Sequence, residues 1–355
     1  MGWRFHRRMT IFPGVSMNFG KTGTSFSVGP RGMKTNISSR GISQSFGIPG
    51  TGLSYRTPVQ KWSNSSVPHQ STRRKLSPAE HQQLVRQEDY QKLDLGFFAK
   101  LTLSSEEKSL VEGVRAYIAG DLAKAETSLK NAACYVDAAF TLGFIYLNSG
   151  RFDDAAAMFQ QAERHPEQIG AFYRKYQLGM TLNLTISPFL AVDLPPDIVT
   201  AYLAHVEALQ QIGKTTEACD ILLSLYKQNP MNHLVIISLA ELVLESSPNN
   251  VQWMNAIVNL TKNVDNETYM HAVMLMYKAE AFDNLKMYDA AITTLTSALR
   301  KKAGRPREFL IELQYQRGVL YARTGRKAQA VKDLNEVFAQ DPDYADVRQR
   351  LAQLA

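Results

Sequence analysis

The sequence predicts an α-solenoid of repeated helical hairpins that follows a small, glycine-rich all-β domain. In the last two-thirds of the chain, one pattern of small and large side chains returns about every 30 to 34 residues, as stacked helix pairs require. The first 56 residues instead place glycines between short β-favouring runs. Charge divides in the same region: residues 1–76 carry 12 Lys and Arg and no Asp or Glu, whereas acidic residues outnumber basic ones in the remainder. We therefore expect two separate physical units.

Residues 1–56 are predicted to form a small β-meander. Glycine supplies the positive φ that tight turns need. The runs between the glycines that favour strands are Val15–Phe19, Thr24–Val28, Met33–Ser38 and Ile42–Phe46. A sheet this small is marginally stable alone, so we expect it to pair with itself, with a partner or with the helical part.

Residues 57–76 are predicted to be a solvated, basic linker, because they are rich in Ser, Pro and Lys or Arg. A helix then begins at a capping box, Ser77–Glu80, with Pro78 at the first helical position. This predicts a helical lead-in over residues 77–105. The Ser104–Glu107 segment has the same capping pattern at the start of the repeats.

Residues 106–344 carry the repeats. The clearest unit places Gly143 and Tyr146 on a first helix, Gly150 in a turn, and Ala155 and Phe159 on a second helix. Small residues let paired helices approach closely while large ones fill the space beside them. The same places are taken by Gly113, Gly120, Ala125, Leu129 and Ala132, and again by Gly318, Tyr321, Gly325, Ala330 and Leu334. A generic α-bundle, the alternative, has no reason to repeat its small residues at a fixed period.

Two stretches depart from this pattern and are expected to be degenerate repeats that keep only a first helix. In residues 170–195 that helix contains Leu178–Gly179, and Pro188, Pro195 and Pro196 are expected to force an irregular segment. In residues 233–266 the helix contains Leu239–Ala240. Residues 345–355 are predicted to form the capping helix that shields the last apolar face of a solenoid.

The repeat pattern resembles the tetratricopeptide repeat family over residues 106–355. The resemblance implies an α-solenoid of tetratricopeptide-type helical hairpins, whose first helices line a concave groove that holds a protein or peptide. By the same resemblance, the groove residues are Phe140, Phe144, Asn148, Met276, Glu280, Asn284, Tyr315 and Arg323. For Phe140 and Phe144, a place in the core between repeats fits equally well.

The first 56 residues resemble a small bacterial family known as domain of unknown function 4236. The segments that carry the resemblance are Gly2–Phe5, Pro13–Val15, Gly20–Gly23, Ser27–Gly32 and Gly47–Tyr55. The resemblance implies a bacterial origin and no particular activity.

The sequence contains no recognisable motif for catalysis, cofactors or metals, so we expect a protein that is not an enzyme and that binds no cofactor or metal. The Gly20–Lys21–Thr22 segment resembles a phosphate loop, but Gly14 stands one residue too far upstream and a strand-like run follows. The seven histidines form no His-Glu-x-x-His pair, and the two cysteines have no second ligand nearby in sequence. No apolar run is long enough to span a bilayer. We expect a cytoplasmic protein.

The favoured function is a scaffold or adaptor that binds a protein or peptide partner in the concave groove. The alternative is binding of nucleic acid or an anionic surface through the basic residues 1–76, where Trp3, Phe5 and Phe26 are interspersed among cations. A third hypothesis is an enzyme or regulator whose active groups come from a partner.

Overall fold

A computed structural model of the chain describes the strands between residues 7 and 56, residues 78–96 and residues 101–354, with side chains from Gln82 onward. The predicted linker, residues 57–76, and the predicted cap residue Ser77 lie outside the described residues. In the strand-forming part, six strands pair in sequence order as an antiparallel meander. They are β1 (Arg7–Phe12), β2 (Val15–Gly20), β3 (Gly23–Val28), β4 (Met33–Ser38), β5 (Gly41–Ile48) and β6 (Leu53–Arg56). The four runs singled out in the sequence fall within β2 to β5.

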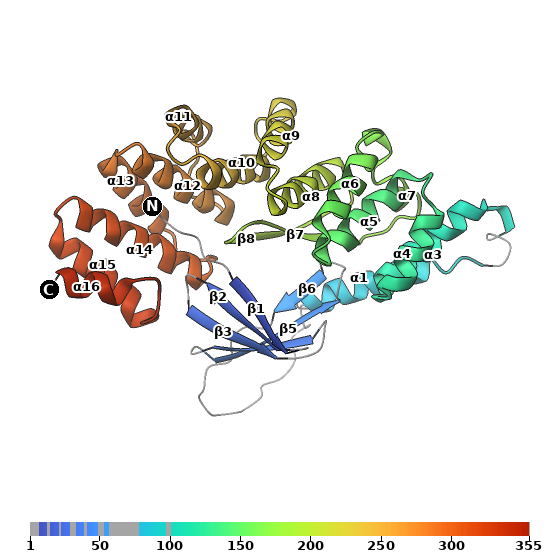
Figure 1. Cartoon of the computed structure of the whole chain (residues 1–355), viewed down its shortest axis with the longest axis horizontal. Helices are drawn as coiled ribbons and strands as arrows, with labels where there is room; N and C mark the ends of the chain where they lie inside the picture. Colours follow the sequence, from blue (N-terminus) through green and yellow to red (C-terminus); the bar gives the residue numbers. More distant parts are fainter. Residues whose placement is uncertain are drawn as a thin grey trace, which may run out of the picture.

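The helical part of the described residues contains six antiparallel helix pairs that stack into an arch (Figure 1). The first helices are α3 (Ser105–Ala119), α5 (Val136–Asn148), α8 (Ile198–Gln211), α10 (His233–Ser246), α12 (Tyr269–Asn284) and α14 (Arg307–Arg323). The second helices are α4 (Leu122–Asn131), α6 (Phe152–Ala162), α9 (Thr215–Gln228), α11 (Val251–Leu260), α13 (Tyr288–Leu299) and α15 (Lys327–Gln340). Helix α1 (Pro78–Lys92) precedes the pairs and α16 (Val347–Leu354) follows them. In Figure 1, α9, α11 and α13 lie on the outer side of the arch, and α8, α10 and α12 on its inner side.

The glycines singled out in the sequence lie where paired helices touch. A Cβ atom added to Gly143 would lie 2.6 Å from the Phe159 ring, and one added to Gly113 would lie 2.7 Å from Leu129. Only a residue without a side chain lets the two helices of these pairs come this close. The predicted contact between the small residue of the first helix and the large residue of the second is therefore confirmed.

Five of the six turns between these paired helices share one geometry; the α10–α11 turn has no residue with positive φ. Gly120, Gly150, Gly213 and Gly325 adopt φ values between 74° and 84°. The next N–H then bonds back to a carbonyl five residues earlier, as Arg151 does to Tyr146 at 2.9 Å. This is the left-handed helix cap that glycine favours. The pair α12–α13 keeps the geometry with Lys286, at φ 61°, in the glycine position.

The two stretches expected to be degenerate repeats differ from the prediction. Residues 233–266 form a complete helix pair, because α11 follows α10 where only a first helix was expected. In residues 170–195 the helix is the short α7 (Ala171–Lys175), preceded by the 3₁₀ turn η1 (Pro166–Gln168), and Leu178–Gly179 lies beyond it in non-helical chain. The expected irregular segment is instead an antiparallel β-hairpin of β7 (Leu182–Ser187) and β8 (Leu190–Leu194), with Pro188 in its turn.

The apolar core runs through the helical part as one large cluster from Leu93 to Leu320. A second, small cluster joins α14, α15 and α16 through Ile311, Leu334, Val337, Tyr344 and Val347. Because α16 covers the last apolar face of this cluster, it acts as a cap. Among the described residues, none of the helices has the length and apolarity to cross a membrane.

Candidate functional site

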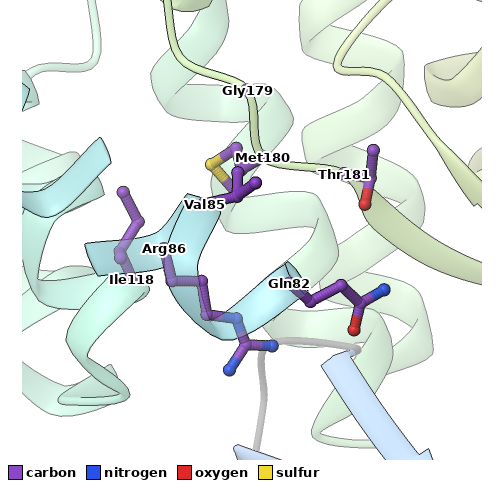
Figure 2. A pocket seen from close by; sticks show the side chains of 7 residues that line it. All are labelled: Gln82, Val85, Arg86, Ile118, Gly179, Met180 and Thr181. Atoms are coloured by element: carbon purple, nitrogen blue, oxygen red, sulfur yellow. The ribbon is translucent and has the colours of Figure 1, made fainter. Parts of the chain in front are cut away.

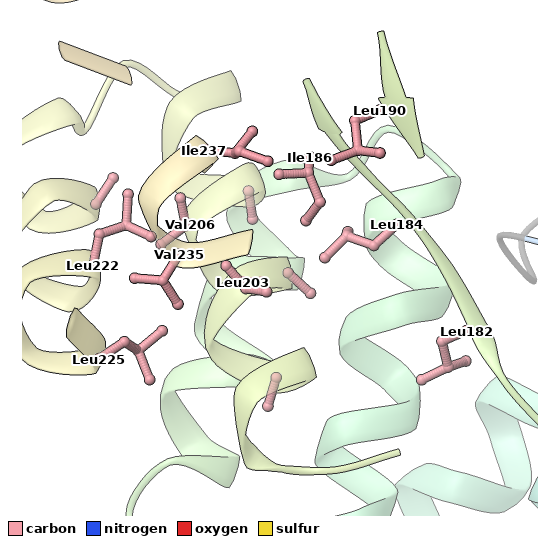
Figure 3. Packing of buried hydrophobic residues seen from close by; sticks show 14 of the residues in the cluster. Leu182, Leu184, Ile186, Leu190, Leu203, Val206, Leu222, Leu225, Val235 and Ile237 are labelled. Carbon is pink, nitrogen blue, oxygen red and sulfur yellow. The ribbon is translucent and has the colours of Figure 1, made fainter. Parts of the chain in front are cut away.

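The β7–β8 hairpin covers part of the inner side of the arch. The side chains of Leu182, Leu184 and Ile186 on β7 are buried, whereas Thr185 between them is exposed. Alternate burial of this kind means that one face of the hairpin packs on the helices. Strand β7 contacts α8 and α10, and Figure 3 shows Ile186 and Leu190 beside Ile237 of α10. The chain therefore covers this stretch of its own inner face.

The tip of the hairpin is fastened to two further first helices. The Tyr269 hydroxyl, at the start of α12, donates a hydrogen bond to the Phe189 carbonyl. The Phe189 ring also meets the Phe309 ring of α14, with centroids 5.7 Å apart. Tyr269 and Phe309 in turn pack edge to face at 5.1 Å. Burial raises the pKa of Tyr269, which favours the protonated form of this hydroxyl that donates the bond. The hairpin thus runs across the amino-terminal halves of α10, α12 and α14.

Three of the groove residues predicted from the sequence belong to the interior. Phe140, Phe144 and Met276 are at most 1% exposed. Phe144 packs edge to face against Phe140 and against Phe159 of α6, with centroids 5.2 and 5.4 Å apart. In this structure a partner therefore does not reach them.

Three other predicted groove residues are exposed, and each lies at the carboxyl-terminal end of a first helix. Asn148 ends α5 and donates from Nδ2 to the Phe144 carbonyl at 2.8 Å. Asn284 ends α12, and Arg323 ends α14. Arg323 is paired with Asp283 through both carboxylate oxygens, at 2.6 and 2.7 Å. We call Asn148, Asn284 and Arg323 the exposed rim; Arg323 contacts the half-buried Asp283.

The remaining two predicted residues, Glu280 and Tyr315, are half-buried. The Tyr315 hydroxyl donates to Asp346 and accepts from Arg350 Nε at 3.1 Å, so the ring is held against the capping helix. Burial, together with the bond to Asp346, raises the pKa of Tyr315 to about 12. Tyr315 therefore serves the capping contact more directly than the exposed rim.

The residues with described side chains show no grouped metal ligands. They contain no cluster of three or more His, Cys, Asp or Glu placed to hold a metal ion. His205 on α8 is buried and lies 2.9 Å from a Glu163 oxygen. This pair accounts for the burial of the histidine without a ligand.

The hairpin was missed by reasoning from the sequence, although a signal was present. Residues Leu182 to Ser187 alternate apolar and polar side chains, which is the period of a half-buried strand. The prolines around this run favoured the reading of a broken helical repeat. Phe189, which follows Pro188 at the tip, was missed for the same reason.

Comparison with family models now places the repeats. Residues 137–167 and 311–354 match models of the tetratricopeptide repeat, and residues 3–56 match the model of a protein of unknown function, DUF4236. The helical part is a solenoid of tetratricopeptide-type repeats. Both resemblances drawn from the sequence are thereby confirmed. Comparison with curated proteins gives no match.

Solved structures similar to this chain include several tetratricopeptide proteins. A thermophilic one from Thermus thermophilus is 16% identical, with a TM-score of 0.37 over 62% of this chain and 98% of that one. One from Parabacteroides merdae is 18% identical, with a TM-score of 0.48 over 70% and 85% of the two chains. The N-terminal domain of the EccA1 ATPase from the ESX-1 secretion system of Mycobacterium tuberculosis is 13% identical, with a TM-score of 0.48 over 78% and 90%. Nothing about partners follows from likenesses at this level. Nucleic-acid binding through residues 1–76 finds no support among the matches.

Proposed function

We propose that this chain is a non-enzymatic scaffold that holds a protein or peptide partner at the exposed rim. The observation that carries the proposal is the set of exposed polar side chains at the carboxyl-terminal ends of α5, α12 and α14, on a repeat fold commonly used to bind proteins. An amide such as Asn148 or Asn284 can bond to the backbone of an extended peptide. Arg323 offers a guanidinium whose ion pair with Asp283 is partly solvated and can exchange for a partner's carboxylate.

The proposal also assigns a role to each segment of the chain. Residues 1–56 form a separate all-β domain that supplies a second contact, residues 57–76 link it to the solenoid, and residues 77–105 lead into the repeats at 106–344. The charge difference between residues 1–76 and the remainder supports two surfaces with different partners. Cys134 and Cys219 are free thiols, which suits action in the reducing cytoplasm.

The test is affinity capture with the full-length chain from a lysate of the source organism. The variant Asn148→Ala/Asn284→Ala/Arg323→Ala removes three rim side chains, and Arg348→Ala removes an exposed arginine whose ion pair with Asp343 lies in the capping segment. We expect a protein that the wild type and Arg348→Ala retain and the triple variant loses, while circular dichroism shows the same helix content in all three. Retention of the same proteins by the triple variant would overturn the proposal.

A further inference from the structure

A small pocket opens where α1 meets the end of α3 and the segment that leads into β7. Its volume is about 100 Å³. Val85, Ile118 and Met180 line it with apolar side chains, and Gln82, Arg86 and Thr181 contribute polar groups. Figure 2 shows Val85 and Met180 together at one end, with the Arg86 guanidinium extending away from them. The pocket is therefore apolar at one end and cationic at the other.

The guanidinium of Arg86 has no counter-ion among the residues with described side chains. Its Nε is buried and finds no hydrogen-bond acceptor there. Asp193, the carboxylate whose charge acts on it, is already held by Gln82 Nε2 and Asn183 Nδ2, each at 2.9 Å. Asp193 thus bonds to two neutral amides, and its charge acts on Arg86 without a direct ion pair.

A second carboxylate, that of Asp89, lies one turn further along α1, and it does not form an ion pair with Arg86 either. Its Oδ1 accepts from Lys92 Nζ and from the Gly179 N–H, both at 3.0 Å. Its Oδ2 is buried and, within the described residues, has no partner. Asp89 therefore holds Lys92 and the chain before β7 in place, and Arg86 points elsewhere.

Partial burial without a direct ion pair is unfavourable for a cation. Burial lowers the pKa of Arg86, and the nearby Tyr117 and Asp193 offset only part of this. An incoming anion would offset this cost, and a carboxylate matches the planar donor geometry of a guanidinium best. The apolar end favours an organic anion over an inorganic one, because a free inorganic anion would leave Val85, Ile118 and Met180 without contact.

We propose that this pocket binds a carboxylate that carries a short aliphatic group. Arg86 receives the two carboxylate oxygens, and Val85, Ile118 and Met180 receive the alkyl group. A cavity of about 150 Å³ accepts benzene, so this smaller pocket suits about three to four carbon atoms. The site is on α1 and the segment before β7, outside the exposed rim, and does not depend on the proposed function.

Two sources share this chemistry: a free small carboxylic acid, and the C-terminal residue of a peptide that ends in an aliphatic side chain. The probes are therefore isobutyrate, with isobutyramide as its neutral match, and a short peptide ending in valine, as free acid and as C-terminal amide. Saturable binding of isobutyrate with no gain from the peptide assigns the site to a free acid. Tighter binding of the free-acid peptide assigns it to a chain terminus.

The experiment uses the full-length chain at constant ionic strength. Binding is measured by calorimetry, and the Arg Nε–Hε signals are followed by NMR in the same titration. We expect isobutyrate to shift one Arg signal saturably and isobutyramide to bind at least about tenfold more weakly. Arg86→Gln should lose the response by a similar factor, Arg86→Lys should lose part of it, and the matched control Arg348→Gln should keep it.

Equal binding of isobutyrate and isobutyramide would overturn the proposal, because the charge would then have no role. An unchanged response in Arg86→Gln would also overturn it. If Arg86→Gln proves unfolded by circular dichroism, the wild-type NMR titration and Arg86→Lys decide: no shifted Arg signal, or full binding by Arg86→Lys, contradicts the pocket.

Discussion

The amino-terminal halves and the carboxyl-terminal ends of the first helices differ in what lies over them. Across the amino-terminal halves of α10, α12 and α14, the hairpin buries apolar side chains and fastens its tip to Tyr269 and Phe309. At the carboxyl-terminal ends, Asn148, Asn284 and Arg323 face solvent. The difference teaches that a repeat fold does not by itself guarantee an open groove. An insertion between repeats can use the apolar part of the inner face as core, which leaves less of that face open to solvent.

The largest effect is expected on the underside of the hairpin. Leu184 is 4% exposed, so Leu184→Ala should lower the free energy of unfolding by about 2–4 kcal/mol through lost contacts and the cavity left behind. The matched variant Thr185→Ala on the outer face should change it by no more than about 0.5 kcal/mol. Urea denaturation followed by circular dichroism measures both. Equal effects would mean that the hairpin does not pack on the helices.

A substitution at the tip of the hairpin should lower the free energy of unfolding by a smaller amount. Tyr269→Phe removes the hydrogen bond to the Phe189 carbonyl and keeps the ring packing against Phe309, so a loss of about 1 kcal/mol is expected. Tyr226→Phe, at a half-buried tyrosine on α9, is the control. A loss in the control as large as in Tyr269→Phe would show that the tip bond adds nothing specific.

At the carboxyl-terminal ends of the first helices, a substitution can stabilise the folded chain. Lys286 holds φ 61° in the turn after α12, where four of the other turns between paired helices use glycine. Lys286→Gly should raise the free energy of unfolding by up to about 1 kcal/mol, because relief of the strained conformation outweighs the entropy that glycine gains when unfolded. Gly325→Lys, at φ 74° in the matching turn, should act in the opposite direction. A destabilised Lys286→Gly variant would show that the side chain makes contacts that outweigh the strain.

The smallest effect on stability is expected at the exposed rim. The ion pair between Arg323 and Asp283 is partly solvated, so Arg323→Ala should change the free energy of unfolding by less than about 1 kcal/mol, and less still at high salt. Denaturation at two salt concentrations measures this. A large, salt-independent loss would assign Arg323 to the structure and remove it from the rim.

Much of the solenoid follows from local spacing, and little of the hairpin does. The contact of Gly143 with Phe159 and the left-handed turn at Gly150 follow from residue sizes and from the positive φ that glycine permits. The helix pair α10–α11 escaped prediction because its second helix lacks the small-residue signature, although Asn250 caps it by accepting from the Gln252 and Trp253 N–H groups. The burial of Phe140 and Met276 depends on which distant segments pack around each repeat, and repeat position alone does not determine this.

Hydrogen–deuterium exchange of the full-length chain tests most directly whether the hairpin lies against the inner face. Amides in residues 182–194 are predicted to exchange slowly where β7 pairs with β8, at rates closer to those of α8 than to those of the helix turns. Leu184→Ala should accelerate them, while amides of the exposed rim change little. Exchange of 182–194 at the rate of an unstructured peptide in the wild type would contradict the account and return the whole inner face to the groove.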